Sequence, residues 1–192
     1  MSGGRIHKED QTAESGATFS DILKLRRLSG LDGQAKTEAP PEAKQFSMHS
    51  FGAHFCEVAY DPGIARLQVS RWLTVIDGGR MINLKTAKNQ MLGSVVMGIG
   101  MAMLEETVYD QRNGKPVNNN YADYLVAVNT DIPDMNCIFL DFPDMKVNEY
   151  GARGIGEIGL TGCASAVTNA VYHATGVRVR ELPVRLEKLL KT

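Results

Sequence analysis

One short stretch of the sequence carries residues that could do chemistry: residues 151–162, GARGIGEIGLTG. It contains the spacing G-x-G-x-x-G, formed by Gly154, Gly156 and Gly159, and a helix-like stretch follows it. Loops of this spacing bind dinucleotide pyrophosphates, because their backbone N–H groups can approach the phosphates closely. Glu157, however, is a carboxylate in the middle of the run. The stretch therefore allows phosphate binding, acid–base catalysis or a purely structural loop.

Phosphate binding is the weakest of these three hypotheses. Glu181 follows the glycines at about the separation of a ribose-binding acid. The preceding stretch, MKVNEYGAR, is not the apolar strand that a dinucleotide-binding unit needs, and only a short tail follows Glu181. Glu157 would also bring negative charge toward a pyrophosphate.

The other two hypotheses remain open at the level of single residues. In the structural one, Thr161 is a good N-cap and Glu157 favours the positive end of the helix. In the catalytic one, Gly156 has no side chain to shield Glu157, and Ile155 and Ile158 make its surroundings apolar. An apolar setting makes a carboxylate a stronger base, which suits proton abstraction at neutral pH.

Composition excludes several classes of protein. With 192 residues, 43% of them hydrophobic and 22% charged, the chain is typical of one globular domain or a domain with an appendage. The net charge of −1 offers no surface for nucleic acid or an acidic membrane. No apolar run is long enough to span a bilayer, and the start lacks a signal peptide, so a cytoplasmic location is expected. The separated cysteines Cys56, Cys137 and Cys163 predict buried free thiols.

Residues 1–45 are expected to form a polar start, a short helix and a linker. Thr18 and Asp21 have the spacing of a helix capping box, and Gly30 is expected to end that helix. The Pro40-Pro41 pair cannot continue a helix and marks the linker.

Residues 46–192 are expected to form a larger domain of α+β class, because strands and helices do not alternate strictly. A hairpin is expected first, followed by a long helix in which three glycines predict close packing by a neighbour. In the second strand of the hairpin, Leu67, Val69, Leu73 and Val75 alternate as in a half-buried strand. The expected strands are 46–60, 64–77, 121–129, 136–142 and 177–182; the expected helices are 84–108, 161–175 and 184–191; the three glycines are Gly93, Gly98 and Gly100.

Four blocks of the chain resemble, in the same order, the end of the molybdenum-binding subunit of the xanthine dehydrogenase/aldehyde oxidase family. They are HSFGAHFCEV, VIDGGRMIN, NQMLGSVVMGIGMAMLEE and the stretch that begins GARGIGEIGLTG. The bacterial aldehyde-oxidising branch is the most similar. The resemblance implies an α+β fold that forms the C-terminal portion of a molybdopterin-binding domain.

The same resemblance implies roles for three residues. Glu157 matches the glutamate that acts as general base on a hydroxyl held by molybdenum. Gln90 matches the glutamine that hydrogen-bonds the pterin, and Gly156 lets the backbone come close to the metal centre. The histidines at positions 49, 54 and 173 are expected to pack or hydrogen-bond rather than bind metal, since the pterin dithiolene holds molybdenum in this family.

The resemblance also implies cofactors and partners. These are a molybdenum–molybdopterin cofactor in its cytosine dinucleotide form, iron–sulfur and FAD groups on partner chains, and an aldehyde or N-heterocycle as substrate. Family subunits are several times longer, so the chain is expected to be a fragment that needs the remainder of the molybdenum subunit and is inactive alone. A periplasmic location, reached through an export signal on a partner chain, is also compatible with the resemblance. The alternative is a non-catalytic remnant or interaction module without cofactor.

Overall fold

The computed structural model describes residues 4–36, 38 and 40–190. The chain divides into two compact units, Met1–Glu38 and Ala39–Thr192. Residues 1–3 of the polar start and residue 191 of the expected terminal helix lie outside the described residues. The first unit holds a short antiparallel strand pair and one α-helix. Its elements are β1 (Arg5–Ile6), η1 (Ala13–Ser15), β2 (Ala17–Thr18) and α1 (Phe19–Arg26).

The expected capping box of α1 is confirmed. The Asp21 N–H donates to Thr18 Oγ1 at 3.1 Å, and the Thr18 N–H donates to the Asp21 carboxylate at 3.2 Å. The hydrogen bond from the Thr18 side chain is the main cause that lowers the pKa of Asp21. The expected end at Gly30 is wrong, because Arg27 takes the left-handed conformation (φ 50°) and the Leu28 N–H closes the helix on the Leu23 carbonyl.

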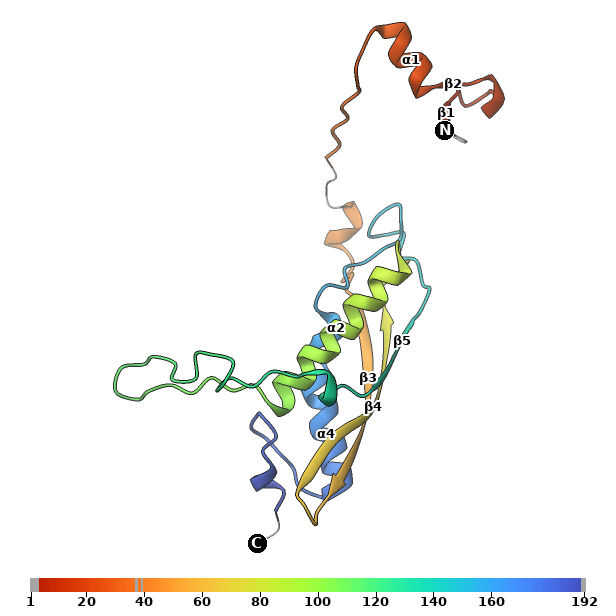
Figure 1. Cartoon of the computed structure of the whole chain (residues 1–192). Coiled ribbons are helices and arrows are strands. Elements are labelled where there is room, and N and C mark those ends of the chain that lie inside the picture. Colours follow the sequence, from red (N-terminus) through yellow and green to blue (C-terminus); the bar gives the residue numbers. More distant parts are fainter. Residues whose placement is uncertain (1–3, 37, 39, 191–192) are drawn as a thin grey trace. The chain divides into compact units, whose positions relative to one another are not determined.

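The larger unit contains a three-stranded sheet and two long helices. Its elements are η2 (Pro41–Lys44), β3 (Phe51–Asp61), β4 (Arg66–Asp77), α2 (Leu84–Met103), η3 (Asn129–Asp131), β5 (Asp134–Phe139), α3 (Ile158–Thr161), α4 (Cys163–Thr175) and η4 (Leu186–Lys188). The strand order is β3-β4-β5 (Figure 1). The expected hairpin is confirmed as the antiparallel pair β3–β4, whereas β5 pairs parallel to β4. A mixed sheet packed with helices makes the class α+β, as expected.

Helices α2 and α4 contact each other and lie along the sheet (Figure 1). Trp72 of β4 is almost fully buried and belongs to one cluster with residues from both helices. That cluster includes Val95 and Ile99 of α2 and Val167 and Val171 of α4. The main core therefore lies between one face of the sheet and these two helices.

The expected alternation along β4 holds only for its first half. Leu67 and Val69 are buried, but in the second half Leu73 and Val75 are only half-buried, and the buried side chains are Trp72, Thr74 and Ile76. The register with β3 shifts at this point, because Glu57 pairs with Arg71 and Val58 pairs with Val69. Ser70 is thus the extra residue of a β-bulge, and a bulge moves the following side chains to the opposite face of the sheet.

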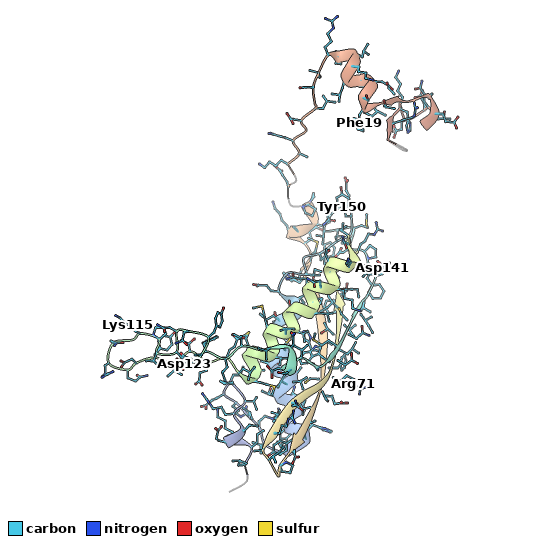
Figure 2. All side chains as sticks on the ribbon, viewed as in Figure 1. Phe19, Arg71, Lys115, Asp123, Asp141 and Tyr150 are labelled. Atoms are coloured by element: carbon cyan, nitrogen blue, oxygen red, sulfur yellow. The ribbon has the colours of Figure 1, made fainter. Side chains whose placement is uncertain are left out.

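Three of the expected elements are wrong in the described part of the chain. Residues 121–129 form a turn and an irregular segment instead of a strand, and Asn120 Oδ1 accepts from the Ala122 N–H in that turn. Residues 177–182 form no strand, and the expected terminal helix is a single turn, η4. The long helix is confirmed but ends at Met103. The segment after it extends away from the two layers, and Lys115 and Asp123 lie on it (Figure 2).

The prediction of close packing by the helix glycines is confirmed at Gly98 and wrong at Gly93. A Cβ atom added to Gly98 would clash with Cys163 Cβ at the start of α4, whereas one added to Gly93 would meet nothing within 4 Å. Gly100 lies against the Glu105 side chain, with 2.5 Å between an added Cβ and Oε1. Gly98 therefore sets the close approach of α2 and α4.

Replacing Gly98 with alanine is expected to destabilise the chain by about 1–3 kcal/mol, because the new methyl group overpacks the helix contact. The matched control, Gly93→Ala, is expected to be neutral or to stabilise by up to about 1 kcal/mol through helix propensity. Urea unfolding of the two variants measures both values. Equal effects from the two substitutions would show that the contact with Cys163 does not decide the packing.

Candidate functional site

The backbone of the glycine loop is hydrogen-bonded to the long helix α2 and to the short helix α3. Gln90 Nε2, on α2, donates to the Gly156 carbonyl at 2.6 Å. The next carbonyl, that of Glu157, accepts from the Leu160 N–H at 3.0 Å and from the Thr161 N–H at 3.4 Å. The structure therefore joins Gln90 to Gly156, the residue before Glu157, whereas the Glu157 side chain borders a different hollow from the groove that Gln90 and Gly156 line.

The Glu157 side chain is exposed. It borders a hollow of about 220 Å³ that is also lined by Gly98, Met101 and Leu160, among others. Glu157 precedes the first residue of α3, yet its side chain makes no capping hydrogen bond. Thr161 lies inside α3, and the residue before α4 is Gly162, so the prediction of Thr161 as N-cap is wrong.

The apolar neighbours of Glu157 anchor the loop rather than surround the carboxylate. Ile155 and Ile158 pack against a second core cluster that contains Ile76 and Met91. Burial of these two side chains, on either side of Glu157, therefore attaches the loop to the core. The expected apolar setting for the carboxylate is wrong, since these side chains turn inward while Glu157 remains exposed.

The glycines of the loop have two different environments. A Cβ atom added to Gly159 would lie 2.8 Å from Ser94 Cβ on α2, so this glycine permits close packing. An added Cβ at Gly154 or Gly156 would meet nothing within 4 Å, and neither residue has a positive φ. The described part of this chain therefore gives no steric reason for glycine at these two positions. The run also follows a long loop rather than a strand, which agrees with rejecting a dinucleotide site.

A buried ion cluster anchors the start of the loop. The Arg153 guanidinium forms ion pairs with Asp77, at the end of β4, and with Asp144, the latter at 3.1 Å. The side chains are 12%, 9% and 20% exposed, respectively. The backbone adds to this attachment, because the Arg153 N–H donates to the Gly78 carbonyl at 2.8 Å. Sequence reasoning missed this cluster, and only the charge of Arg153 inside the glycine loop could have signalled it.

A groove of about 480 Å³ lies beside Gln90 and Gly156. Its lining also includes Arg80, Asn83 and Arg153. Gln90 is exposed at its edge, and in residues 4–36, 38 and 40–190 no donor reaches Gln90 Oε1. Polar groups at this edge can therefore meet a ligand that has both donors and acceptors.

The expectation of a packed or hydrogen-bonded histidine is confirmed for His54, and that of a buried free thiol for Cys137 and Cys163, whereas Cys56 is half-buried. In the described part of the chain, no group of three or more His, Cys, Asp or Glu residues has metal-binding geometry. His49 and His173 are exposed, and His54 is hydrogen-bonded inside the fold. The cysteines are free thiols. Burial raises the pKa of Cys56 and Cys163 to about 12, so these thiols stay protonated at neutral pH.

Comparison with known protein families defines the class of protein. The chain belongs to the family of the molybdopterin cofactor-binding domain, whose sequence pattern matches residues 2–133. Gln90 lies inside the matched residues, and Glu157 lies after them. The resemblance inferred from the sequence blocks is confirmed.

Several of the curated relatives are named as molybdenum-binding subunits. The aldehyde oxidoreductase molybdenum-binding subunit PaoC of Escherichia coli O157:H7 is 43% identical over 174 residues, which are 90% of this chain and 24% of the relative. The xanthine dehydrogenase molybdenum-binding subunit of the same organism is 32% identical over 140 residues, which are 73% of this chain and 18% of the relative. The chain therefore spans about a quarter or less of the length of these relatives.

Solved structures show the same fold. Quinoline 2-oxidoreductase from Pseudomonas putida 86 matches with a TM-score of 0.66 and 30% identity, over 71% of this chain and 18% of that one. The aldehyde oxidoreductase from Desulfovibrio desulfuricans ATCC 27774 matches with a TM-score of 0.66 and 30% identity, over 73% of this chain and 15% of that one. The α+β architecture is thus that of a portion of a molybdenum enzyme.

Proposed function

We propose that the chain supplies part of the active site of a molybdenum hydroxylase that oxidises an aldehyde or an N-heterocycle with oxygen derived from water. One observation carries this proposal. Gln90 donates to the carbonyl of Gly156, although the two residues are separated by 66 positions in the sequence. The amide proposed to meet the pterin therefore holds the backbone of the residue that precedes the proposed base, Glu157.

The residues present fit a pterin cofactor. The exposed Gln90 amide borders the groove with an acceptor oxygen to spare, and an amide suits the mixed donors and acceptors of a pterin edge. Gly154 and Gly156 leave space where any other residue would place a Cβ atom. When bound, the molybdenum cofactor would take up electrons from the substrate and activate the water-derived oxygen.

Glu157 is proposed as the general base. Its carboxylate has no hydrogen-bond or ion-pair partner in the described part of the chain, so it is available to accept a proton at a carboxylate oxygen. The neighbouring carbonyls fix the backbone of the loop, while the side chain remains free to turn toward the attacking oxygen. General-base catalysis of this kind is worth about 10²–10⁴-fold in rate.

Further parts of the proposal rest on the sequence and on its resemblance to the family. We propose that residues 46–192 form the cofactor-binding part, that the cofactor is the cytosine dinucleotide form, and that the remainder of the molybdenum subunit and chains with iron–sulfur and FAD groups complete the enzyme. One relative is named as subunit gamma of a dehydrogenase complex, which supports an assembly of several chains.

Among the described helices, none is long and apolar enough to cross a membrane. A cytoplasmic location is proposed, with export on a partner's signal as the alternative.

Purification of the tagged chain from its own host tests this function, with molybdenum and pterin measured in the product. We expect a partner polypeptide and molybdenum to copurify with the wild-type chain. Gln90→Leu is expected to lower the retained molybdenum about tenfold, because a hydrogen bond to the pterin is lost. Asn89→Leu, an exposed change at the adjacent position of α2, should retain the wild-type content.

Two outcomes would contradict the proposal. A chain that copurifies with neither molybdenum nor a partner would be the non-catalytic remnant. Stoichiometric molybdenum in the chain purified alone would refute the proposed need for the remainder of the subunit.

A further inference from the structure

A buried hydrogen-bond chain runs from the sheet to the glycine loop. Trp72 Nε1 donates to Thr74 Oγ1 at 2.9 Å, and the same oxygen lies 2.9 Å from His54 Nδ1. Thr74 and Trp72 are almost fully buried, and the His54 ring stacks at a tilt on Trp72 with 5.7 Å between centroids. His54 also hydrogen-bonds the backbone of Ile158, the residue that follows Glu157.

These partners fix which nitrogen of His54 carries the proton. The indole N–H can only donate, so Thr74 Oγ1 accepts from it and its own buried hydroxyl hydrogen needs an acceptor. His54 Nδ1 is the acceptor within reach, which leaves the proton on Nε2, and this N–H donates to the Ile158 carbonyl. Burial lowers the pKa of His54, which favours the neutral ring that this arrangement requires.

The His54 bond completes a series of three anchored carbonyls. The Gly156 carbonyl accepts from α2, the Glu157 carbonyl accepts from α3, and the Ile158 carbonyl accepts from β3 through His54. Gly162 closes over the ring, since an added Cβ would lie 2.5 Å from His54 Cδ2. The peptide groups on both sides of Glu157 are thus held by different elements of the fold.

We propose that His54 is a positioning residue for Glu157, because its ring joins the buried Thr74 hydroxyl of the sheet to the Ile158 carbonyl of the loop. This inference rests on the proposed role of Glu157 as base. It assigns no direct contact between His54 and substrate or cofactor.

Amide hydrogen exchange in the full chain tests the proposal without any bound cofactor. The Leu160 and Thr161 amides report on the loop, because both donate to the Glu157 carbonyl. His54→Leu is expected to speed their exchange about tenfold, since one net hydrogen bond is lost. His54→Gln, which keeps an N–H donor near the Nε2 position, is expected to restore much of the protection. His173→Leu, an exposed change on α4, should leave the exchange at wild-type rates.

The ¹⁵N spectrum of the His54 ring gives an independent readout. We expect the Nε2–H tautomer in the wild-type chain and its loss in Thr74→Val, a variant that keeps the side-chain volume and also serves if His54→Leu does not fold. In the molybdenum-loaded assembly, His54→Leu is expected to lower kcat more than tenfold with KM unchanged, and His54→Gln is expected to recover part of that loss.

A proton on Nδ1, or unchanged exchange at Leu160 and Thr161 in His54→Leu, would overturn the positioning role. Neither measurement depends on turnover. Failure of this inference is therefore distinguishable from failure of Glu157 as base, which only the activity of a Glu157 variant can reveal.

Discussion

Replacing Glu157 with glutamine is expected to lower turnover of the assembled enzyme by about 10²–10⁴-fold, the value of a general base. Glutamine has the same shape but does not accept a proton at neutral pH. The Gln90 side chain and the Leu160 and Thr161 N–H groups donate to backbone carbonyls of the loop and not to the Glu157 side chain. The loop should therefore stay in place. Bound molybdenum and the free energy of unfolding are therefore expected to match the wild-type values, while kcat falls.

Glu149→Gln is the matched control for this experiment, because Glu149 is an exposed glutamate in the loop before the glycine run. It should leave kcat unchanged. If Glu157→Gln retains full turnover together with wild-type cofactor content, the general base lies elsewhere. A parallel fall of turnover and bound molybdenum would instead assign Glu157 to cofactor retention.

Replacing Arg153 with methionine is expected to destabilise the chain by about 3–5 kcal/mol, because it leaves the buried Asp77 carboxylate and the partly buried Asp144 carboxylate without their cation. Arg153 is only 12% exposed, and its partners Asp77 and Asp144 are 9% and 20% exposed. The attachment between β4 and the glycine loop should weaken with it, since the cluster joins these two segments. Urea unfolding gives the size of the loss.

The control for this change is Arg71→Met. Arg71 lies on the sheet and pairs with Glu57 at 2.8 Å, but the two side chains are 70% and 53% exposed (Figure 2). Exposed ion pairs add little to stability, so this variant should unfold at nearly the wild-type urea concentration. Similar losses in the two variants would show that the Arg153 cluster is no stronger than a surface pair.

Local signals in the sequence predicted the parts of the fold that depend on neighbouring residues. The capping box of Thr18 and Asp21 forms within four residues, and the hairpin of β3 and β4 joins two strands that follow each other in the chain. The prediction of a strand at 121–129 was wrong, because its apolar residues pair with no strand in the described part of the chain and Asn120 forms a turn there instead. The prediction of regular alternation along β4 failed beyond Ser70, because a bulge depends on the register between two strands and not on one strand alone.

The residues of the candidate site were proposed from the sequence, but the contacts that support the loop could not be predicted from it. The spacing of glycines around Glu157 indicated an unusual loop, and the resemblance to a family selected Gln90. The Arg153–Asp77 pair joins residues 76 positions apart, and His54 of β3 hydrogen-bonds the backbone of Ile158, the first residue of α3. Such pairings arise only when the sheet and helices pack, and a single sequence carries no periodic signal for them.

The free carboxylate of Glu157 has a consequence for how substitutions at this position would be noticed. Its main-chain atoms hold the loop together, whereas its carboxylate touches nothing that the described chain needs in order to fold. A survey of thermal melting or cellular abundance would therefore score most replacements at 157 as harmless. Only an assay that follows chemical conversion would distinguish them, so the residue with the largest proposed effect on the reaction is nearly silent in measurements of protein yield.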